Sequence, residues 1–150
     1  MTAAFREARL PKAAWTHQAH VAAGLWFVRH HGLETARIVV PAAIRRHNAA
    51  VGTADTATSG YHETLTQLYL SLIDEFIREW SGPADYPTMA AAAVEALNDR
   101  RIPLRYYSEA RLGSAEARAT WVEPDLISDP GAGRRPGPVD SPPPEPSIGG

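Results

Sequence analysis

The chain has 150 residues, 44% of them hydrophobic, which is enough for one domain with one packed core. Its formal charge of −2 argues against a nucleic-acid-binding protein, which normally carries a basic face. It has no cysteine, which excludes disulfides, thiolate metal sites and cysteine nucleophiles. Any metal ion would therefore be held by His, Asp or Glu side chains.

The sequence predicts neither a signal peptide nor a membrane span. Residues 1–10 are mixed and charged, and no apolar run approaches the ~20 residues that a membrane span needs. We therefore expect a cytoplasmic protein that does not bind a membrane.

Four long helical patterns without a convincing strand predict an all-α fold, a four-helix-bundle-like single domain over residues 1–128. The first helix begins at Pro11 or Thr16 and ends before Gly32. The second covers about residues 33–50, and Pro41 in its middle should kink the helix or split it in two.

The apolar positions expected on the second helix are Ile38, Ala42, Ile44 and Val51. The basic residues beside them should face water: Arg37, Arg45, Arg46 and His47.

The third helix, at about residues 60–80, has the clearest apolar stripe, which consists of Leu65, Tyr69, Leu72, Ile73 and Phe76. Thr88 should cap a fourth, alanine-rich helix that runs to about residue 98. Two short helical turns follow, at about residues 108–112 and 114–121. Residues 129–150 are rich in proline and glycine, so we expect a disordered tail there.

The first candidate site cluster is Trp15-Thr16-His17-Gln18-Ala19-His20. His17 and His20 are three positions apart and share one face of the first helix. Gly24 continues that face and leaves room for a ligand or for a close helix contact. His30 and His31 end the same helix, where they can bond its last carbonyl groups, and His31 is the reserve ligand.

The second cluster is Thr58-Ser59-Gly60-Tyr61-His62-Glu63-Thr64. His62 lies at the head of the apolar stripe, where the helix N-terminus favours a neutral imidazole, the form that binds metals. Glu63 can ligate a metal, orient His62, act as a general base or simply cap the helix. Tyr61 can donate a proton or a hydrogen bond to a substrate. Asp55, Thr56 and Ser59 either line the mouth of the site or serve as loop and cap residues.

We expect the two clusters to meet and form one metal site, with His17, His20, His62 and Glu63 as ligands. Three imidazoles and a carboxylate suit one divalent metal, either Zn, Fe, Ni or Mn. The alternative is that the histidines are hydrogen-bonded residues of the core. An H-x-x-H pair alone lacks the tighter context of H-E-x-x-H.

These two clusters, together with Val122-Glu123-Pro124-Asp125-Leu126, resemble the motifs of a group of short bacterial proteins of unassigned function. That resemblance covers about residues 10–127 and implies no named activity. In size and class the chain is also similar to DinB-like metal-binding bundles. Those use H-x-x-x-H on one helix, whereas the spacing here is H-x-x-H and on a different helix.

The sequence thus predicts a small metal-dependent enzyme, a hydrolase, lyase or oxidoreductase, that acts on a small-molecule substrate through Glu63 and Tyr61. The alternative is a non-catalytic helical module that binds a small molecule or a partner protein. Four tryptophans and the alanine-rich helix suit a homodimer face or a core equally well. Arg111, Arg118 and residues 123–125 could fold back over the bundle as a closing segment, but the sequence favours a plain surface Arg–carboxylate pair.

Overall fold

The computed structural model describes residues 17–54, 56 and 60–127. These residues form α-helices and one 3-10 turn but no strand, which confirms the all-α prediction. The elements, in chain order, are α2 (His17–His31), α3 (Leu33–Ala50), α4 (Glu63–Glu79), α5 (Tyr86–Leu97), η2 (Ile102–Arg105), α6 (Glu109–Leu112) and α7 (Ala115–Ala119). The predicted tail at residues 129–150 and the first cluster up to Thr16 lie outside the described residues.

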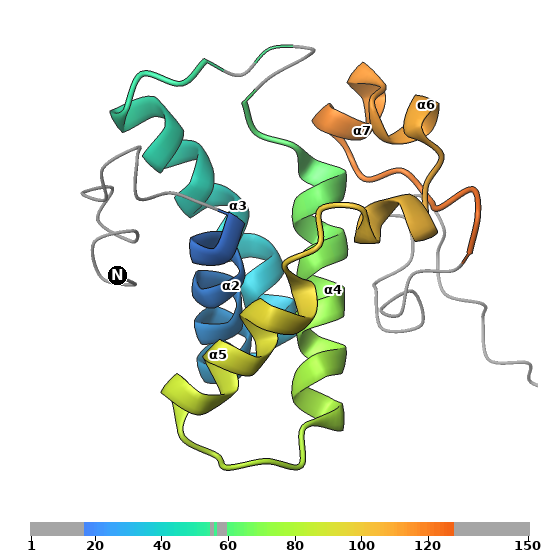
Figure 1. Ribbon diagram of the computed structural model, residues 1–150. Coiled ribbons are helices and arrows are strands. Elements are labelled where there is room, and N and C mark those ends of the chain that lie inside the picture. Colours follow the sequence, from blue (N-terminus) through green and yellow to red (C-terminus); the bar gives the residue numbers. More distant parts are fainter. Residues whose placement is uncertain (1–16, 55, 57–59, 128–150) are drawn as a thin grey trace, which may run out of the picture.

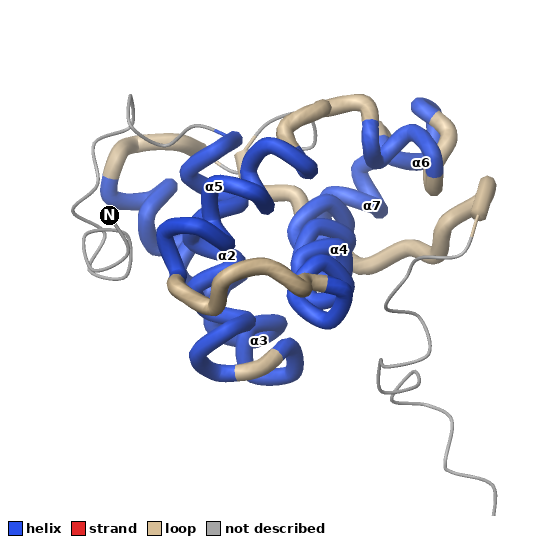
Figure 2. The backbone as a smooth tube through the Cα atoms, turned by 60° about the horizontal axis from the view of Figure 1, so that its bottom comes forward, coloured by secondary structure: helices blue, strands red, loops and turns tan. Residues whose placement is uncertain are grey.

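Helix α2 is the centre of the bundle. It packs against α3, α4 and α5, while α4 also contacts α3 and, through its N-terminal half, α7 (Figures 1 and 2). A Cβ atom added at Gly24 would lie 2.8 Å from Cδ1 of Ile73. Gly24 therefore allows α2 and α4 to approach closely, which is one of the two roles that the sequence suggested.

The buried face of α3 differs from the predicted one. Its buried side chains follow the spacing Leu33, Ala36, Val40, Ala43 and His47. Ile38 is 75% exposed and Ala42 is also exposed, so these two predicted apolar positions are wrong. His47 was predicted to be exposed and is fully buried, because it continues the i, i+3, i+4 series of the small apolar residues.

Pro41 lies inside α3 without dividing it, since the helix runs unbroken from residue 33 to residue 50. The split that the sequence allowed is therefore not observed. Helix α5 begins three residues earlier than expected, because its cap is Asp85 rather than Thr88. The Asp85 carboxylate accepts bonds from the Thr88 backbone N–H (3.0 Å) and hydroxyl (2.6 Å).

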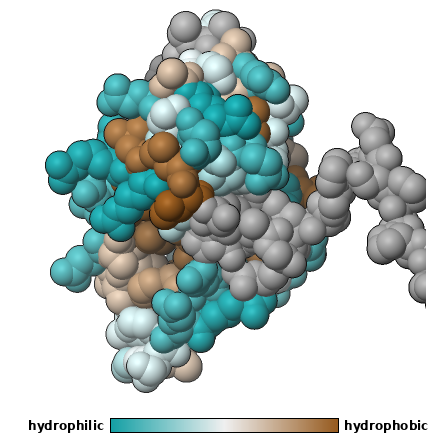
Figure 3. Space-filling view, turned by 90° about the vertical axis from the view of Figure 1, so that its right-hand side faces the viewer, coloured by the Kyte–Doolittle hydropathy of each residue, from teal (hydrophilic) through white to brown (hydrophobic). Residues whose placement is uncertain are grey.

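The C-terminal segment docks on the first turns of α4, on the side away from α3 (Figure 1). Its two predicted helical turns are confirmed as α6 and α7, with Ser108 and Ser114 as N-caps. The face on the right of Figure 1 bears an exposed apolar stripe among polar side chains (Figure 3). In the part of the chain that the structure describes, no helix is long and apolar enough to cross a membrane.

Candidate functional site

A cavity of about 470 Å³ lies between helices α2, α3 and α4. Its volume is within the roughly 300–1,000 Å³ of typical ligand pockets. The apolar part of its wall consists of Val21, Gly24, Val40, Ile44, Val51, Leu65, Leu70 and Ile73. Apart from Gly60, the other lining residues are polar or aromatic: His17, His20, His47, Asn48, Thr53, Tyr61, His62, Thr66 and Tyr69.

His17, the first residue of α2, is held by the end of α5. Its Nε2 lies 2.8 Å from the carbonyl oxygen of Leu97, so this nitrogen carries the proton and donates it. The ring also meets Tyr69 edge to face, with the ring centroids 5.0 Å apart. Burial raises the pKa of Tyr69 to about 12, so its hydroxyl keeps its proton and can donate a hydrogen bond.

His20 lies one turn further along α2, where it lines the cavity but remains exposed to solvent. The protein around the ring still desolvates it in part, which lowers its pKa to about 4, and the nearby His17, His47 and Arg100 add to this shift. Burial likewise lowers the pKa of His47, which comes from α3. Both imidazoles are therefore neutral at pH 7.

His62 precedes the first residue of α4 and serves as its N-cap. Its Nδ1 accepts the backbone N–H of Leu65 at 3.1 Å, so the ring proton is on Nε2, which donates to the carbonyl of Leu112 at 2.8 Å. Burial lowers the pKa of His62, and the positive charge of Arg118 acts in the same direction. Both ring nitrogens are thus engaged by backbone groups, and the neutral form is the one these bonds require.

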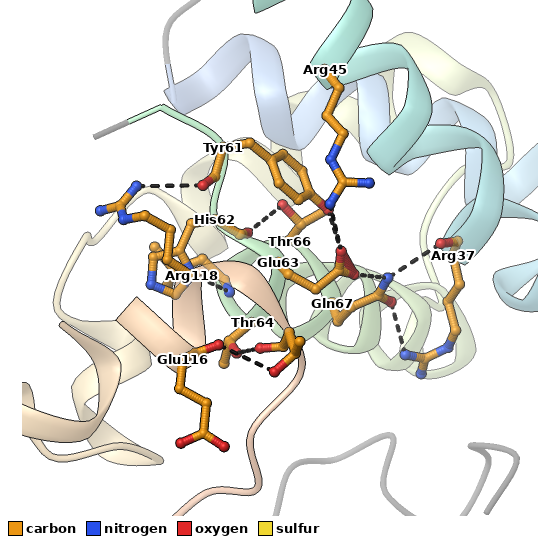
Figure 4. Close-up of polar contacts among 12 residues, drawn as sticks. Arg37, Arg45, Tyr61, His62, Glu63, Thr64, Thr66, Gln67, Glu116 and Arg118 are labelled. Atoms are coloured by element: carbon orange, nitrogen blue, oxygen red, sulfur yellow. Dashed lines mark hydrogen bonds and ion pairs between the residues drawn. The ribbon is translucent and has the colours of Figure 1, made fainter. Parts of the chain in front are cut away.

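Tyr61 and Glu63 belong to a polar network that joins α3 and α4 (Figure 4). The Tyr61 hydroxyl donates to Glu63 Oε2 at 2.8 Å, and Gln67 donates to Glu63 Oε1 at 2.7 Å. Arg45 lies 3.8 Å from the same carboxylate and 4.4 Å from the centre of the Tyr61 ring. Burial and the Glu63 carboxylate both raise the pKa of Tyr61, which therefore stays protonated.

Arg37 extends this network along α3, although it was expected to face water. Its guanidinium donates to Gln67 Oε1 and Ser71 Oγ, both at 3.2 Å, and its carbonyl accepts from Gln67. The buried stripe of α3 brings Arg37 to the α3–α4 boundary, where α4 presents polar side chains.

The C-terminal segment holds the loop that carries Tyr61 and His62. Arg118 of α7 donates to the carbonyl oxygens of Gly60 at 3.1 Å and Tyr61 at 3.5 Å (Figure 4). Arg111 donates to the carbonyl of Glu123. The C-terminal segment therefore folds back over the bundle. Within the described residues, Arg111 and Arg118 bind carbonyl oxygens and do not form the surface Arg–carboxylate pair that the sequence favoured.

The structure brings most of the predicted site residues to one place. His17, His20, Tyr61 and His62 all line the cavity, while Glu63 is not part of its wall and reaches it only through Tyr61. His31, the reserve ligand, is exposed at the other end of α2, where it contacts Trp26. The neighbouring His30 bonds the Trp26 carbonyl at 2.8 Å, as expected for a residue that ends a helix.

His47, Asn48 and Thr53 line the cavity although the sequence did not suggest them, and a sequence signal exists for His47. The spacing of the small apolar residues before it on α3 would have identified it. Asp55 and Ser59 lie outside the described residues, and Thr56 is exposed.

In residues 17–54, 56 and 60–127, no three His, Asp or Glu side chains are grouped so that they could hold one metal ion. The predicted ligand set would need His62 to release at least one of its two backbone bonds. Metal binding by His17, His20, His62 and Glu63 therefore stays a prediction.

No protein-family model matches the chain, and no curated protein or solved structure shows significant similarity to it. The resemblance to short bacterial proteins, and that to DinB-like bundles, stays a prediction.

Proposed function

We propose that the protein binds a small molecule with a largely apolar body in the cavity between α2, α3 and α4. The observation that carries this proposal is the cavity itself, about 470 Å³, whose wall surface is mainly apolar and carries several polar side chains. Ligand sites typically combine an apolar wall with a few polar groups that orient the ligand. This proposal corresponds to the binding module that the sequence analysis left as its alternative.

The polar groups around the cavity are held in fixed positions, which favours binding. His17 is bonded to Leu97, and Tyr61 to Glu63, so neither ring has to be ordered when a ligand enters. His20 and His47 are neutral at pH 7 because burial lowers their pKa values. A neutral imidazole has one N–H donor and one acceptor nitrogen, so it can orient a polar group on the ligand.

The proposal is tested by filling the cavity from α3. Ile44 lines it, whereas Ile38 lies on the same helix and is 75% exposed. Titration of the neutral fluorophore 1-aminoanthracene should show saturable binding to the wild type and to Ile38→Trp. Ile44→Trp should bind at least about tenfold more weakly, a difference of about 1.4 kcal/mol.

The two variants add the same side chain to the same helix, so the comparison isolates occupation of the cavity. Overpacking can destabilise a core by about 1–3 kcal/mol, so circular dichroism must show that Ile44→Trp is folded. Leu65→Trp, which fills the cavity from α4, is the second variant. Equal fluorophore binding by the wild type and by both cavity-filling variants would contradict the proposal.

A metal-dependent enzyme is the second candidate. It is favoured by the position of His17, His20 and His62 on the wall of one cavity, and by the lowered pKa values of His20 and His62. A divalent metal held there would supply Lewis-acid chemistry or an activated water. The chain's own contribution would be the placement of a substrate against Tyr61, whose hydroxyl is fixed by Glu63.

Metal analysis of protein purified without a histidine tag tests this candidate. A metal-dependent enzyme should contain one divalent metal per chain, and His62→Ala should lower that content. The control is His30→Ala, which removes a histidine from the opposite end of α2. Metal at trace level only, or unchanged metal content in His62→Ala, would eliminate the candidate.

A further inference from the structure

The charges around the cavity are not balanced. No Asp or Glu side chain lies among the lining residues in the described part of the chain. The charged group that acts on His20 is a cation, Arg100, which is exposed just after α5. The other groups that act on His20 are the imidazoles of His17 and His47, which gain positive charge if they are protonated.

Two acidic groups that act on lining residues, Glu63 on Tyr61 and Asp99 on Tyr69, have partners of their own. Asp99 accepts three bonds from Arg101, one from its backbone and two from its guanidinium, at 2.9–3.3 Å. Glu63 accepts bonds from Tyr61 and Gln67 and lies 3.8 Å from Arg45. Arg100 forms no ion pair with a carboxylate within the described residues.

The polar groups of the wall also include hydrogen-bond donors. The Asn48 amide and the Thr53 hydroxyl line the cavity together with His20. An anionic group placed among such donors forms charge-assisted bonds, which are about twice as strong as neutral ones. A cationic group would meet no carboxylate on the wall and would be repelled by Arg100.

We infer that the ligand is a small monocarboxylate with an apolar body, whose carboxylate lies beside His20 and within the field of Arg100. This presupposes that the cavity binds a small molecule, as proposed above. The apolar body lies against the aliphatic part of the wall, which includes Val40, Leu70 and Ile73. Burial of that body supplies most of the affinity, and the carboxylate determines which molecules are selected.

Three eight-carbon probes that differ only in the head group test the inference. Octanoate, 1-octanol and octylamine each compete with 1-aminoanthracene at pH 7.5. Octanoate should displace the fluorophore at a concentration at least about tenfold lower than octanol, and octylamine should be the weakest. Added salt should weaken octanoate binding and leave octanol binding unchanged.

Variants of His20 and Arg100 then show which of these residues causes the preference for octanoate over octanol. His20→Leu should bring octanoate and octanol to similar affinity without weakening octanol. Arg100→Gln should weaken octanoate about threefold, as expected for one exposed charge, and leave octanol unchanged. Arg78→Gln is the matched control, because Arg78 pairs with Asp74 near the far end of α4.

The outcomes separate this inference from the proposed function. If the fluorophore binds but octanol or octylamine competes as well as octanoate, the anionic ligand is wrong and the cavity remains a binding site. A preference for octanoate that survives both His20→Leu and Arg100→Gln would also overturn the inference. If the fluorophore does not bind the wild type at all, the proposed function itself fails.

Discussion

His62 joins the start of α4 to the C-terminal segment through two hydrogen bonds to backbone groups. Helix N-caps are usually Ser, Thr, Asp or Asn, whose oxygen accepts a backbone N–H. Here Nδ1 of the imidazole takes that role, and Nε2–H secures the C-terminal segment through Leu112. Both bonds require the neutral ring with its proton on Nε2, so one tautomer joins α4 to the segment that covers it.

Replacing His62 by alanine should therefore destabilise the fold strongly. The change removes an N-cap, typically about 1 kcal/mol, and leaves the partly buried carbonyl of Leu112 without its donor, a further loss of about 1 kcal/mol. The midpoint of urea unfolding measures the effect. His30→Ala, which removes one exposed bond to Trp26, should cost less than about 1 kcal/mol. Equal losses in the two variants would show that His62 is not the structural residue described.

The bond between Tyr61 and Glu63 positions a cavity residue. A double-mutant cycle with Tyr61→Phe and Glu63→Gln should give a coupling free energy of about 1 kcal/mol in unfolding experiments, because the hydroxyl donates directly to the carboxylate. The control cycle pairs Glu63→Gln with Tyr69→Phe, and its coupling should be close to zero. Coupling of similar size in both cycles would contradict the assigned bond.

At the scale of whole elements, the sequence predicted the helices well because their boundaries are marked locally. Gly32 follows α2 with a φ of 83°, a conformation that glycine adopts readily. Ser108 and Ser114 cap the two short C-terminal helices. Such signals depend on a few neighbouring residues, so they can be read without knowing the tertiary packing.

The buried faces were harder to predict, because they depend on what each helix packs against. On α3, the large apolar Ile38 indicated the wrong face, while the small residues Ala36 and Ala43 lie in the core. On α4, the expected stripe included Tyr69 and Phe76, which are partly buried. The fully buried Thr64, Leu68 and Ser71 fall outside that stripe, because other elements cover more than one side of this helix.

The docking of the C-terminal segment on α4 depends on Thr64. Its buried hydroxyl donates to the carbonyl of Thr120 at 2.8 Å and accepts the N–H of Val122 at 3.2 Å. Thr64→Val keeps the shape but removes both bonds, so it should destabilise the protein by about 2 kcal/mol. Thr120→Val, whose hydroxyl is at an exposed site, should cost less than about 0.5 kcal/mol. Urea unfolding tests this contact between α4 and the C-terminal segment, because Thr64→Val should unfold at a lower urea concentration than Thr120→Val.

The cavity is a property of the whole molecule. His17 and His20 come from α2, His47 from α3, and Tyr61 and His62 from the start of α4. The motifs predicted that the histidines of α2 would meet the residues at the start of α4, and both groups do line one cavity. Its volume could not be predicted, because it arises from the way three helix surfaces fit together. The spacing of the small apolar residues on α3 could have placed His47 on the buried face of that helix.

The histidines that line the cavity should make the folded protein sensitive to mild acid. Unfolded histidine binds a proton near pH 6.5, whereas His20 does so in the folded protein only at about pH 4, and burial also lowers the pKa values of His47 and His62. The unfolded chain therefore binds more protons, and stability falls as the pH drops below about 6.5. Melting temperature should decrease from pH 7.5 to pH 5.5.

Between pH 7.5 and pH 5.5, the change in stability reports on the histidines and not on the acidic groups. Hydrogen bonds from neighbouring residues hold the pKa values of the Asp85, Asp99 and Asp125 carboxyl groups below their usual range, so their contribution to stability is lost only in stronger acid. His20→Gln should flatten the decrease between pH 7.5 and 5.5, and His30→Gln should not. A melting temperature that is constant or rises as the pH falls to 5.5 would contradict the assignment.

The most direct test of a ligand in the cavity uses the histidine rings themselves as reporters. In NMR spectra, addition of 1-aminoanthracene should shift the ring resonances of His17, His20, His47 and His62 along a single saturation curve. His30 and His31, at the other end of α2, should not shift. Binding that leaves the four cavity rings unchanged, or that shifts all six histidines equally, would contradict the account.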